Sequence, residues 1–252
     1  MDSIAIKAEN FNHFFGQLQT LKNINLEVQK NEILGIIGPS GSGKSTFLRS
    51  LNRLNDLVPC SRVEGLLTIE GKNIYKTGTS ITELRRKLGI VFASPVPLPR
   101  SIYENIIFGP KMAGIKDKIT LDKLVRQCLE DTAIWEEVKD RLFTSALKLS
   151  GGQQQRLCMA RILALKPDFI LLDEPCSGLD PISTMKIEES LRMLKKDYTI
   201  IIVTNNTKQA ARVADRTAFF LNGEMIEIGP TEKIFTVPKD QRTNDYISGR
   251  FG

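Results

Sequence analysis

Apolar residues at every second position predict β-strands in the N-terminal part of the chain. Successive side chains of a strand point to opposite faces, so a half-buried strand shows an apolar residue at alternate positions. The turn-forming residues Glu70-Gly71-Lys72 end this region. The residues with the alternating pattern are Ile4, Ile6, Ala8, Ile24, Leu26, Val28, Leu67 and Ile69.

Further along, short apolar runs alternate with segments of helical spacing. The runs 32–37, 169–172 and 199–203 have the composition of buried strands. Strands that alternate with helices indicate βαβ units and a mainly parallel sheet. Asn222-Gly223 between two apolar runs predicts a two-residue hairpin turn. The apolar residues at helical spacing are Phe47, Leu48, Leu51, Leu54, Leu121, Leu124, Val125, Cys128, Leu129, Ile187, Leu191 and Leu194, and 156–165 has the same spacing.

A proline-rich segment at 94–99 changes the character of the chain, because proline excludes both helix interior and central strand. Helical signals dominate from there to about residue 165. We therefore predict one α/β domain spanning 1–252. Residues 1–93 and 166–252 form its core, with a mainly parallel sheet and an antiparallel β subdomain, and 94–165 form a helical subdomain.

A glycine-rich segment between the strand 32–37 and the following helix matches the phosphate-binding pattern G-x-x-x-x-G-K-[ST] in full. Its glycines let backbone N–H groups approach phosphate oxygens, and the helix N-terminus adds partial positive charge. Lys44 would reach the β- and γ-phosphates, and the Ser45 hydroxyl would bind Mg²⁺. A chance match in a glycine-rich turn is the alternative, but the flanking strand and helix favour a nucleoside triphosphate site. The segment is Gly38, Pro39, Ser40, Gly41, Ser42, Gly43, Lys44, Ser45 and Thr46.

Two adjacent carboxylates, Asp173 and Glu174, follow the strand 169–172. At the end of a strand in a nucleotide-binding sheet, Asp173 can hold Mg²⁺, usually through water. Glu174 would then orient and deprotonate the attacking water. The alternative is a solvent-exposed acid at a strand end.

A second helix-N-terminal anion site is predicted at 149–153. One nucleotide does not need two phosphate-binding segments from one chain. We therefore expect a head-to-tail pair of chains, in which this segment of one copy closes over the nucleotide held by the other. Taken alone, the segment could be only a helix cap. Its residues after Leu149 are Ser150, Gly151, Gly152 and Gln153.

Composition adds little. The chain has 252 residues, a net charge of +6 and 25% charged residues, which is ordinary for a soluble protein. We expect no signal peptide and no membrane span, and therefore a cytosolic protein. Four cysteines and the single His13 lack metal-ligand spacing, so we expect free thiols and no zinc site. Basic residues are dispersed among acidic ones, and no nucleic-acid-binding motif is present.

The motifs at 38–46, 149–153 and 169–174 together resemble those of ABC transporter ATPase subunits, and the resemblance extends over the whole chain. It implies the P-loop NTPase core of that family, with ATP and Mg²⁺ as ligands. It also implies a head-to-tail dimer that binds two membrane-spanning permease subunits at the cytoplasmic face of the membrane, and no nucleic acid. The helical subdomain and the loop 93–99 would contact the permease.

The resemblance also assigns roles to single residues. Glu174 and Lys44 would be catalytic, and Phe15 would stack on adenine, although a core phenylalanine is the alternative. Asp180 would approach the partner subunit's site from the segment 177–180. Asn205 stands where the family has a histidine that contacts the γ-phosphate.

Segments outside these motifs resemble the ATP-binding subunits of bacterial phosphate importers. Nothing in their chemistry specifies phosphate as cargo, so that assignment rests on resemblance alone. The segments are 51–56, 101–105, 153–158, 231–235 and 246–252.

The chain departs from the family pattern at two catalytic positions. Ala93 replaces a glutamine that contributes an amide oxygen to the Mg²⁺ and water network, and a methyl group cannot do so. Asn205 is shorter than histidine and carries no charge. We expect intact binding of ATP and Mg²⁺ with slowed hydrolysis. Cys176 and Gly178 replace a threonine and an alanine of the family, and because both are small the turn should survive. The backbone freedom of Gly178 should loosen the contact made by Asp180.

Three functions are therefore weighed. The first is the energy-coupling ATPase of a phosphate importer, in which ATP closes the dimer and hydrolysis reopens it. The second is a non-hydrolytic, ATP-dependent regulatory or dimerisation module, favoured by Ala93 and Asn205 but not by Glu174. The third is a soluble ABC protein that acts on nucleic acid or in iron–sulfur assembly.

Overall fold

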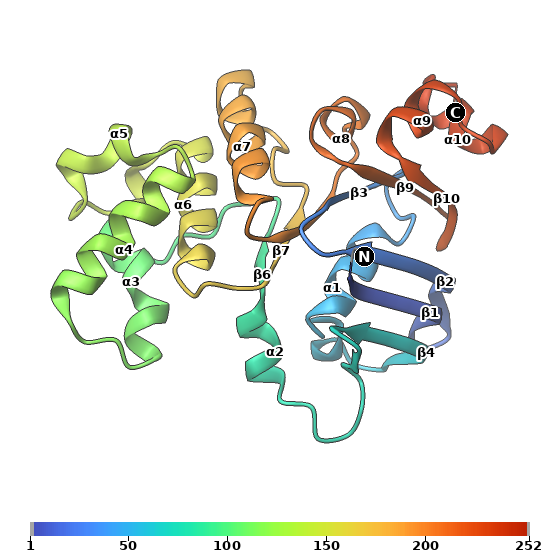
Figure 1. Cartoon of the computed structure of the whole chain (residues 1–252), viewed down its shortest axis with the longest axis horizontal. Helices are drawn as coiled ribbons and strands as arrows, with labels where there is room; N and C mark the ends of the chain where they lie inside the picture. The colour runs from blue at the N-terminus through green and yellow to red at the C-terminus, as the bar shows by residue number, and fades with distance from the viewer. Residues whose placement is uncertain (1–2, 251–252) are drawn as a thin grey trace.

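The computed structural model describes residues 3–250, which form two sheets and the helices around them (Figure 1). A four-stranded antiparallel sheet has the order β2-β1-β4-β5. A six-stranded sheet has the order β10-β9-β3-β8-β7-β6 and is parallel except for the edge pair β9–β10. The strands are β1 Ile4–Phe15, β2 Leu18–Gln29, β3 Ile33–Ile37, β4 Ser61–Ile69, β5 Lys72–Asn73, β6 Leu88–Val91, β7 Phe169–Asp173, β8 Thr199–Val203, β9 Arg216–Leu221 and β10 Glu224–Pro230.

Helices cover both faces of the six-stranded sheet, and α3 to α6 gather at one end of the molecule (Figure 1). The α-helices are α1 Lys44–Leu51, α2 Ile81–Lys87, α3 Ile102–Met112, α4 Lys118–Asp131, α5 Trp135–Val138, α6 Gly151–Leu163, α7 Pro181–Leu194, α8 Thr207–Val213, α9 Thr231–Thr236 and α10 Gln241–Ile247. None of the helices in the described part of the chain is long and apolar enough to cross a membrane.

The expected α/β fold is confirmed, with its mainly parallel sheet, antiparallel sheet and helices. The hairpin at Asn222-Gly223 is confirmed too, and both residues have the positive φ (50° and 84°) that a type I′ turn requires. The prediction that Leu54 continues the helix after the glycine-rich segment is wrong. Helix α1 ends at Leu51, and Arg53 adopts a left-handed φ of 56°. The Asn55 amide folds the chain back onto α1 by donating to the Thr46 carbonyl (2.9 Å).

The hydrophobic core is divided by the six-stranded sheet. All five residues of β8 are buried. Ile200 and Ile202 pack with the cluster that contains α3, α4, α6 and α7, whereas Ile201 and Val203 pack with α1 and the antiparallel sheet. A continuous apolar run is therefore what this strand requires, because both of its faces are covered.

Strand register places the loops that carry the candidate motifs at one edge of the sheet. Ile36 of β3 lies opposite Val203 of β8, which lies opposite Asp173 of β7. The segments that follow these strands start with Gly38, Thr204 and Glu174, so they begin side by side at the carboxyl ends of the strands. Ligands of open α/β sheets bind at this edge.

Candidate functional site

The glycine-rich segment turns sharply between β3 and α1. Gly38 has a φ of 149°, and a Cβ atom at this position would lie 2.1 Å from the carbonyl oxygen of Phe220 on β9. Only glycine therefore allows this close approach. Gly43 is the N-cap of α1 and provides no side-chain cap. The first N–H groups of the helix are thus left for an external acceptor, which favours an anion.

Lys44 brings a buried positive charge into this turn. Lys44 is only 5% exposed, and its Nζ donates to the carbonyl oxygens of Gly38 (2.7 Å) and Pro39 (2.8 Å). Among residues 3–250, no carboxylate lies within ion-pair distance of this ammonium group. Burial lowers the pKa of Lys44, and the charges of Glu174 and Asp173 oppose that effect. A bound anion would supply the missing countercharge.

Asp173 stands at the end of β7 with both carboxylate oxygens engaged. The Ser45 hydroxyl donates to Oδ1 (2.7 Å), and Arg49 Nη2 donates to Oδ2 (2.9 Å). Asp173 is only 4% exposed, so Arg49 compensates much of its charge. The structure thus brings together the two residues predicted to hold Mg²⁺, and a hydroxyl with a carboxylate is a donor set that suits this ion.

Glu174 directly follows and adopts a left-handed φ of 53°. Its backbone N–H donates to the Val203 carbonyl (2.8 Å), and its Oε1 accepts from the backbone N–H of Asn205 (3.1 Å). Burial raises the pKa of Glu174, while the Asn205 amide and Lys44 act to lower it. A carboxylate with a raised pKa is a better proton acceptor than an ordinary one. The structure therefore places Glu174 and Asn205 in contact, through the backbone of Asn205.

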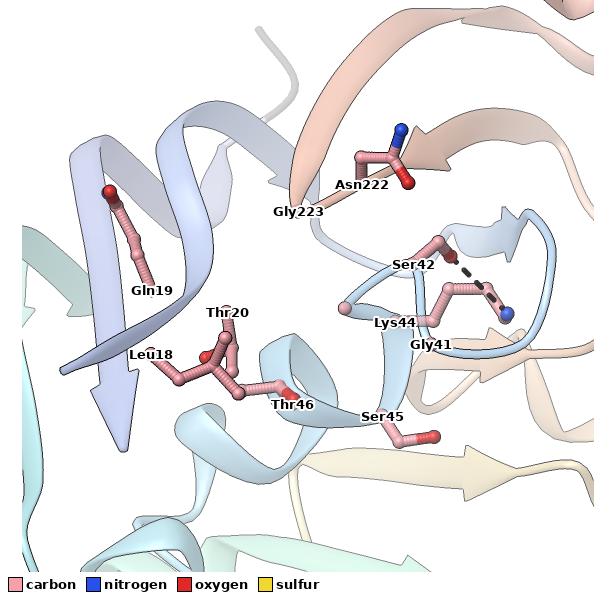
Figure 2. A pocket seen from close by; sticks show the side chains of 11 residues that line it. Leu18, Gln19, Thr20, Gly41, Ser42, Lys44, Ser45, Thr46, Asn222 and Gly223 are labelled. Carbon is pink, nitrogen blue, oxygen red and sulfur yellow. Dashed lines mark hydrogen bonds between the residues drawn. The ribbon is translucent and has the colours of Figure 1, made fainter. Parts of the chain in front are cut away.

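A pocket of about 460 Å³ lies over the glycine-rich segment, between the start of β2 and the β9–β10 turn (Figure 2). Gly223 connects all three segments: its N–H donates to the Ser42 carbonyl (3.1 Å) and its carbonyl accepts from the Lys22 N–H (2.7 Å). The pocket walls are thus fixed to one another by backbone hydrogen bonds. The lining residues are Leu18, Gln19, Thr20, Gly41, Ser42, Gly43, Lys44, Ser45, Thr46, Asn222 and Gly223.

Phe15 does not line this pocket. It ends β1, and its ring and the His13 ring form a T-shaped pair with a centroid distance of 4.5 Å. Leu18, which lies opposite Phe15 in the hairpin, lines the pocket and is 66% exposed. The stacking of Phe15 on adenine stays a prediction.

Ser150 and Gln153 form a capping box at the start of α6. The Gln153 N–H donates to Ser150 Oγ (3.4 Å), and the Ser150 N–H donates to the Gln153 side chain (3.0 Å). Asp180 caps α7 in a similar way by accepting from the N–H (2.9 Å) and hydroxyl (2.6 Å) of Ser183. Ser183 also lies against Gly152, where a Cβ would come within 2.2 Å of its Oγ. The two caps are therefore neighbours, and none of residues 150–153 or 180 lines the pocket.

Glu137 lies in α5 and joins the two capped helices, α6 and α7. It accepts from Gln153 (2.9 Å) and Arg156 (2.7 Å) of α6 and from Lys186 (2.5 Å) of α7. Burial acts to raise the pKa of Glu137, but these three donors together lower it to about 2. The carboxylate is therefore charged at any physiological pH.

Ala93 lies in the loop between β6 and α3 and offers no polar side-chain atom. Gln155 of α6 donates to the Phe92 carbonyl (2.9 Å), and Arg161 donates to the Val96 carbonyl (2.9 Å). The loop is thus attached to α6 on both sides of Ala93. The methyl group of Ala93 therefore cannot bind Mg²⁺.

Arg49, Glu137 and the pocket wall 18–20 were not anticipated from the sequence. Ser45 and Arg49 are four residues apart on α1, so they share a face of the helix and could have been paired with Asp173. Glu137 is joined to α6 and α7 only by tertiary packing. Within residues 3–250, no three His, Cys, Asp or Glu side chains gather closely enough to hold a metal ion.

The strand, glycine turn, buried lysine and strand-end aspartate define this protein as a P-loop nucleotide-binding protein. Comparison with known families then gives the particular group: residues 21–177 match the ABC transporter family. The chain belongs to this family and is an ABC-type ATPase.

Relatives with similar sequences extend over nearly the whole chain. Phosphate import ATP-binding protein PstB 3 of Streptococcus pneumoniae serotype 4 is 57% identical over 239 residues, which cover 95% of this chain and 96% of the relative. Phosphate import ATP-binding protein PstB of Borreliella afzelii is 57% identical over 251 residues, which cover 100% of this chain and 96% of the relative.

Solved structures with the same fold include cbiO1 of Clostridium perfringens, described as part of the ABC transporter complex cbiONQ. It has a TM-score of 0.83 and 27% sequence identity, with 99% of this chain and 97% of that chain covered. A bacterial Atm1-family ABC exporter with ATP bound has a TM-score of 0.81 and 25% identity, with 99% of this chain and 42% of that chain covered.

Proposed function

We propose that this chain is the ATP-binding, energy-coupling subunit of an importer for inorganic phosphate. The observation that carries the proposal is 57% identity to phosphate import ATP-binding proteins over nearly the full chain. The complete phosphate loop with its strand-end carboxylates supports the same function. The cargo is proposed from the relatives, because the site described above would bind only the nucleotide and not the transported substrate.

ATP and Mg²⁺ fit the residues that are present. The uncapped N-terminus of α1 and the buried Lys44 suit the triphosphate, and Ser45 with Asp173 suits the ion. When bound, Mg²⁺ would offset negative charge on the phosphate oxygens. Lys44 would exchange its contacts with the Gly38 and Pro39 carbonyls for phosphate oxygens.

Glu174 is proposed as the general base. The Asn205 N–H occupies Oε1, which leaves Oε2 for a water molecule whose proton it would accept. The sharp backbone turn at Glu174 is fixed by the hydrogen bond to Val203, so the carboxylate is held beside the phosphate loop. We further propose that Ala93 and Asn205 slow the hydrolysis step relative to chains with glutamine and histidine at these positions.

A second copy of the chain is proposed to complete the site. The start of a helix suits a phosphate because of its partial positive charge. The capped segment 150–153 and Asp180 nevertheless do not line the pocket of their own chain. A head-to-tail dimer would bring them to the nucleotide of the partner. Binding of ATP would close this dimer, and hydrolysis would reopen it.

Two membrane-spanning permease subunits are proposed as the further partners, which would place the chain at the cytoplasmic face of the membrane. The helical subdomain, proposed as 94–165, and the loop 93–99 would contact them. Exposed apolar side chains support this surface: Val96 is 62% and Met112 74% exposed.

Uptake of labelled phosphate by cells that lack this chain tests the proposal. The intact chain should restore uptake of phosphate but not of labelled sulfate, whereas Lys44→Ala should restore neither. Purified Lys44→Ala should also lose ATP affinity by at least about 10²-fold, because it removes a charged hydrogen-bond donor from a buried site. Unchanged phosphate uptake in cells without the chain would contradict the proposed cargo.

A further inference from the structure

Arg49 faces the candidate site from the last turn of α1. It lies four residues beyond Ser45, so the two side chains share one face of the helix. Each donates to a different oxygen of the Asp173 carboxylate on β7: the Ser45 hydroxyl to Oδ1 (2.7 Å) and Arg49 Nη2 to Oδ2 (2.9 Å). The carboxylate is therefore held between two donors that come from a single helix.

The two partners of the Arg49–Asp173 ion pair differ in exposure. The Asp173 side chain is 5% exposed, whereas the Arg49 side chain is 45% exposed. Burial of a carboxylate is costly unless its oxygens accept hydrogen bonds, so Asp173 depends on its donors. Without the donor to Oδ2, the carboxylate could rotate, because the last torsion of an aspartate side chain has no sharply preferred angle. Arg49 therefore limits the orientations that Asp173 can adopt.

The guanidinium group of Arg49 has a second neighbour, the ring of Phe92. Its central carbon lies 5.9 Å from the ring centroid, which is within the range of a cation–π contact. Strand register explains this position. Val91 of β6 lies opposite Leu172 of β7, so Phe92 and Asp173 follow side by side at the ends of the two strands. Arg49 thus contacts both strand ends, which restricts where its charge can lie.

These contacts of Asp173 are compatible with a bound ion. A carboxylate has about four acceptor positions, and Ser45 and Arg49 use two of them. A serine hydroxyl that donates its hydrogen to Oδ1 still has lone pairs for a cation. Groups that hold a metal ligand in place from outside commonly tune the affinity for the ion. Arg49 has the position of such a group.

We propose that Arg49 is a positioning residue for the Mg²⁺ site, which holds the Asp173 carboxylate in the orientation that binds the ion together with Ser45. This inference rests on the proposed function, and it gives Arg49 no contact with the ion itself. A guanidinium group suits this task because its N–H groups have a fixed planar geometry, whereas a lysine ammonium group provides mainly charge. The shape of the side chain should therefore matter, and not its charge alone.

The variants Arg49→Lys and Arg49→Gln test the inference through the gain in nucleotide affinity that Mg²⁺ provides. This gain is the ratio of two Kd values for a non-hydrolysable ATP analogue, measured by calorimetric titration with EDTA and with excess Mg²⁺. Loss of a group that supports a metal ligand typically lowers metal affinity about 10- to 100-fold, so the gain should fall about tenfold in both variants. The Kd in EDTA should stay within about twofold of the unaltered chain, which also shows that the variants are folded.

Arg212→Lys is the matched control. Arg212 of α8 donates to Glu188 of α7 (2.6 Å), and this pair likewise joins a half-exposed arginine to a buried carboxylate. Neither residue lines the pocket over the glycine-rich segment. The gain from Mg²⁺ should therefore be the same in Arg212→Lys as in the unaltered chain, and an equal loss in this variant would contradict a specific role of Arg49.

A role of Arg49 in charge compensation alone predicts a different result. Arg49→Lys would then keep the full gain from Mg²⁺, and Arg49→Gln would increase it, because a positive charge near the ion is removed. Either result would overturn the inference and leave the proposed function intact. Absence of analogue binding by the unaltered chain, with or without Mg²⁺, would overturn both.

Discussion

The phosphate loop and the capped segment 150–153 are both helix N-termini, but they are built differently. The N-terminus of α1 has no side-chain cap, and its lysine is buried, with no carboxylate of residues 3–250 at ion-pair distance. The N-terminus of α6 is closed by the reciprocal hydrogen bonds of Ser150 and Gln153 and lies outside the pocket. The first N–H groups of α1 are therefore free to bind a ligand within one chain. At the start of α6, the Ser150 side chain already accepts from the helix, so a ligand there has to come from another molecule.

This difference implies that the two helix ends serve different steps, binding of ATP by one chain and closure of the dimer. An uncapped helix end holds unsatisfied N–H groups, so it gains directly from a phosphate. A capped end gains less and needs a ligand that arrives already positioned. We therefore expect one chain to bind ATP by itself and the second segment to act only in the closed dimer.

Glu174→Gln should produce the largest effect, because it removes the chemistry and leaves both helix ends intact. Loss of a general base lowers the rate by about 10²–10⁴-fold. ATP binding should be unchanged, and the ATP-bound dimer should accumulate in size-exclusion chromatography with Mg²⁺. In the unaltered chain, the hydrolysis rate should fall as pH decreases through the raised pKa of Glu174, since the protonated acid accepts no proton.

A Gln variant that hydrolyses ATP as fast as the unaltered chain would show that another group accepts the proton. The variant Glu189→Gln changes an acid on the surface of α7 in the same way and serves as its control.

The double change Ala93→Gln and Asn205→His should raise the rate of ATP hydrolysis at the phosphate loop. Each introduces the side chain that is proposed to speed hydrolysis at its position, and one such donor is typically worth about 10²–10³-fold in rate. The two gains need not multiply, so we expect an increase of about 10²-fold in kcat. Single-turnover hydrolysis of labelled ATP by the single and double variants measures it. No gain would favour a function that uses ATP without cleaving it.

Ser150→Ala tests the capped segment 150–153 and should have the smallest effect. Ser101→Ala is its matched control, since Ser101 forms the same kind of capping box with Glu104 at the start of α3. Each change should lower the free energy of unfolding by about 1 kcal/mol. Only Ser150→Ala should slow ATP hydrolysis, by about tenfold through loss of one hydrogen bond to a charged group. Equal rates for the two variants would contradict a role of this segment at the partner's nucleotide.

Local patterns were sufficient for the elements that depend on local rules. The hairpin at Asn222-Gly223 and the buried strand predicted at 169–172 formed where expected, because turn chemistry and burial on both faces depend on adjacent residues. The end of α1 was missed because it depends on Asn55, which folds back onto the helix through hydrogen bonds to Thr46 and Ser50.

The site was predictable only in part for a similar reason. The contact of Ser45 with Asp173 follows from the order of strand, loop and helix. The pocket wall from Leu18 to Thr20 depends on how the antiparallel sheet packs beside the phosphate loop. No spacing along the chain encodes that packing.

Glu137 gives the molecule a mechanical property. One carboxylate joins α6, which starts at the capped serine, to α7, which starts at Asp180. Because the same carboxylate binds both helices, a shift of either helix has to strain its bonds to Glu137, so we expect α6 and α7 to move together.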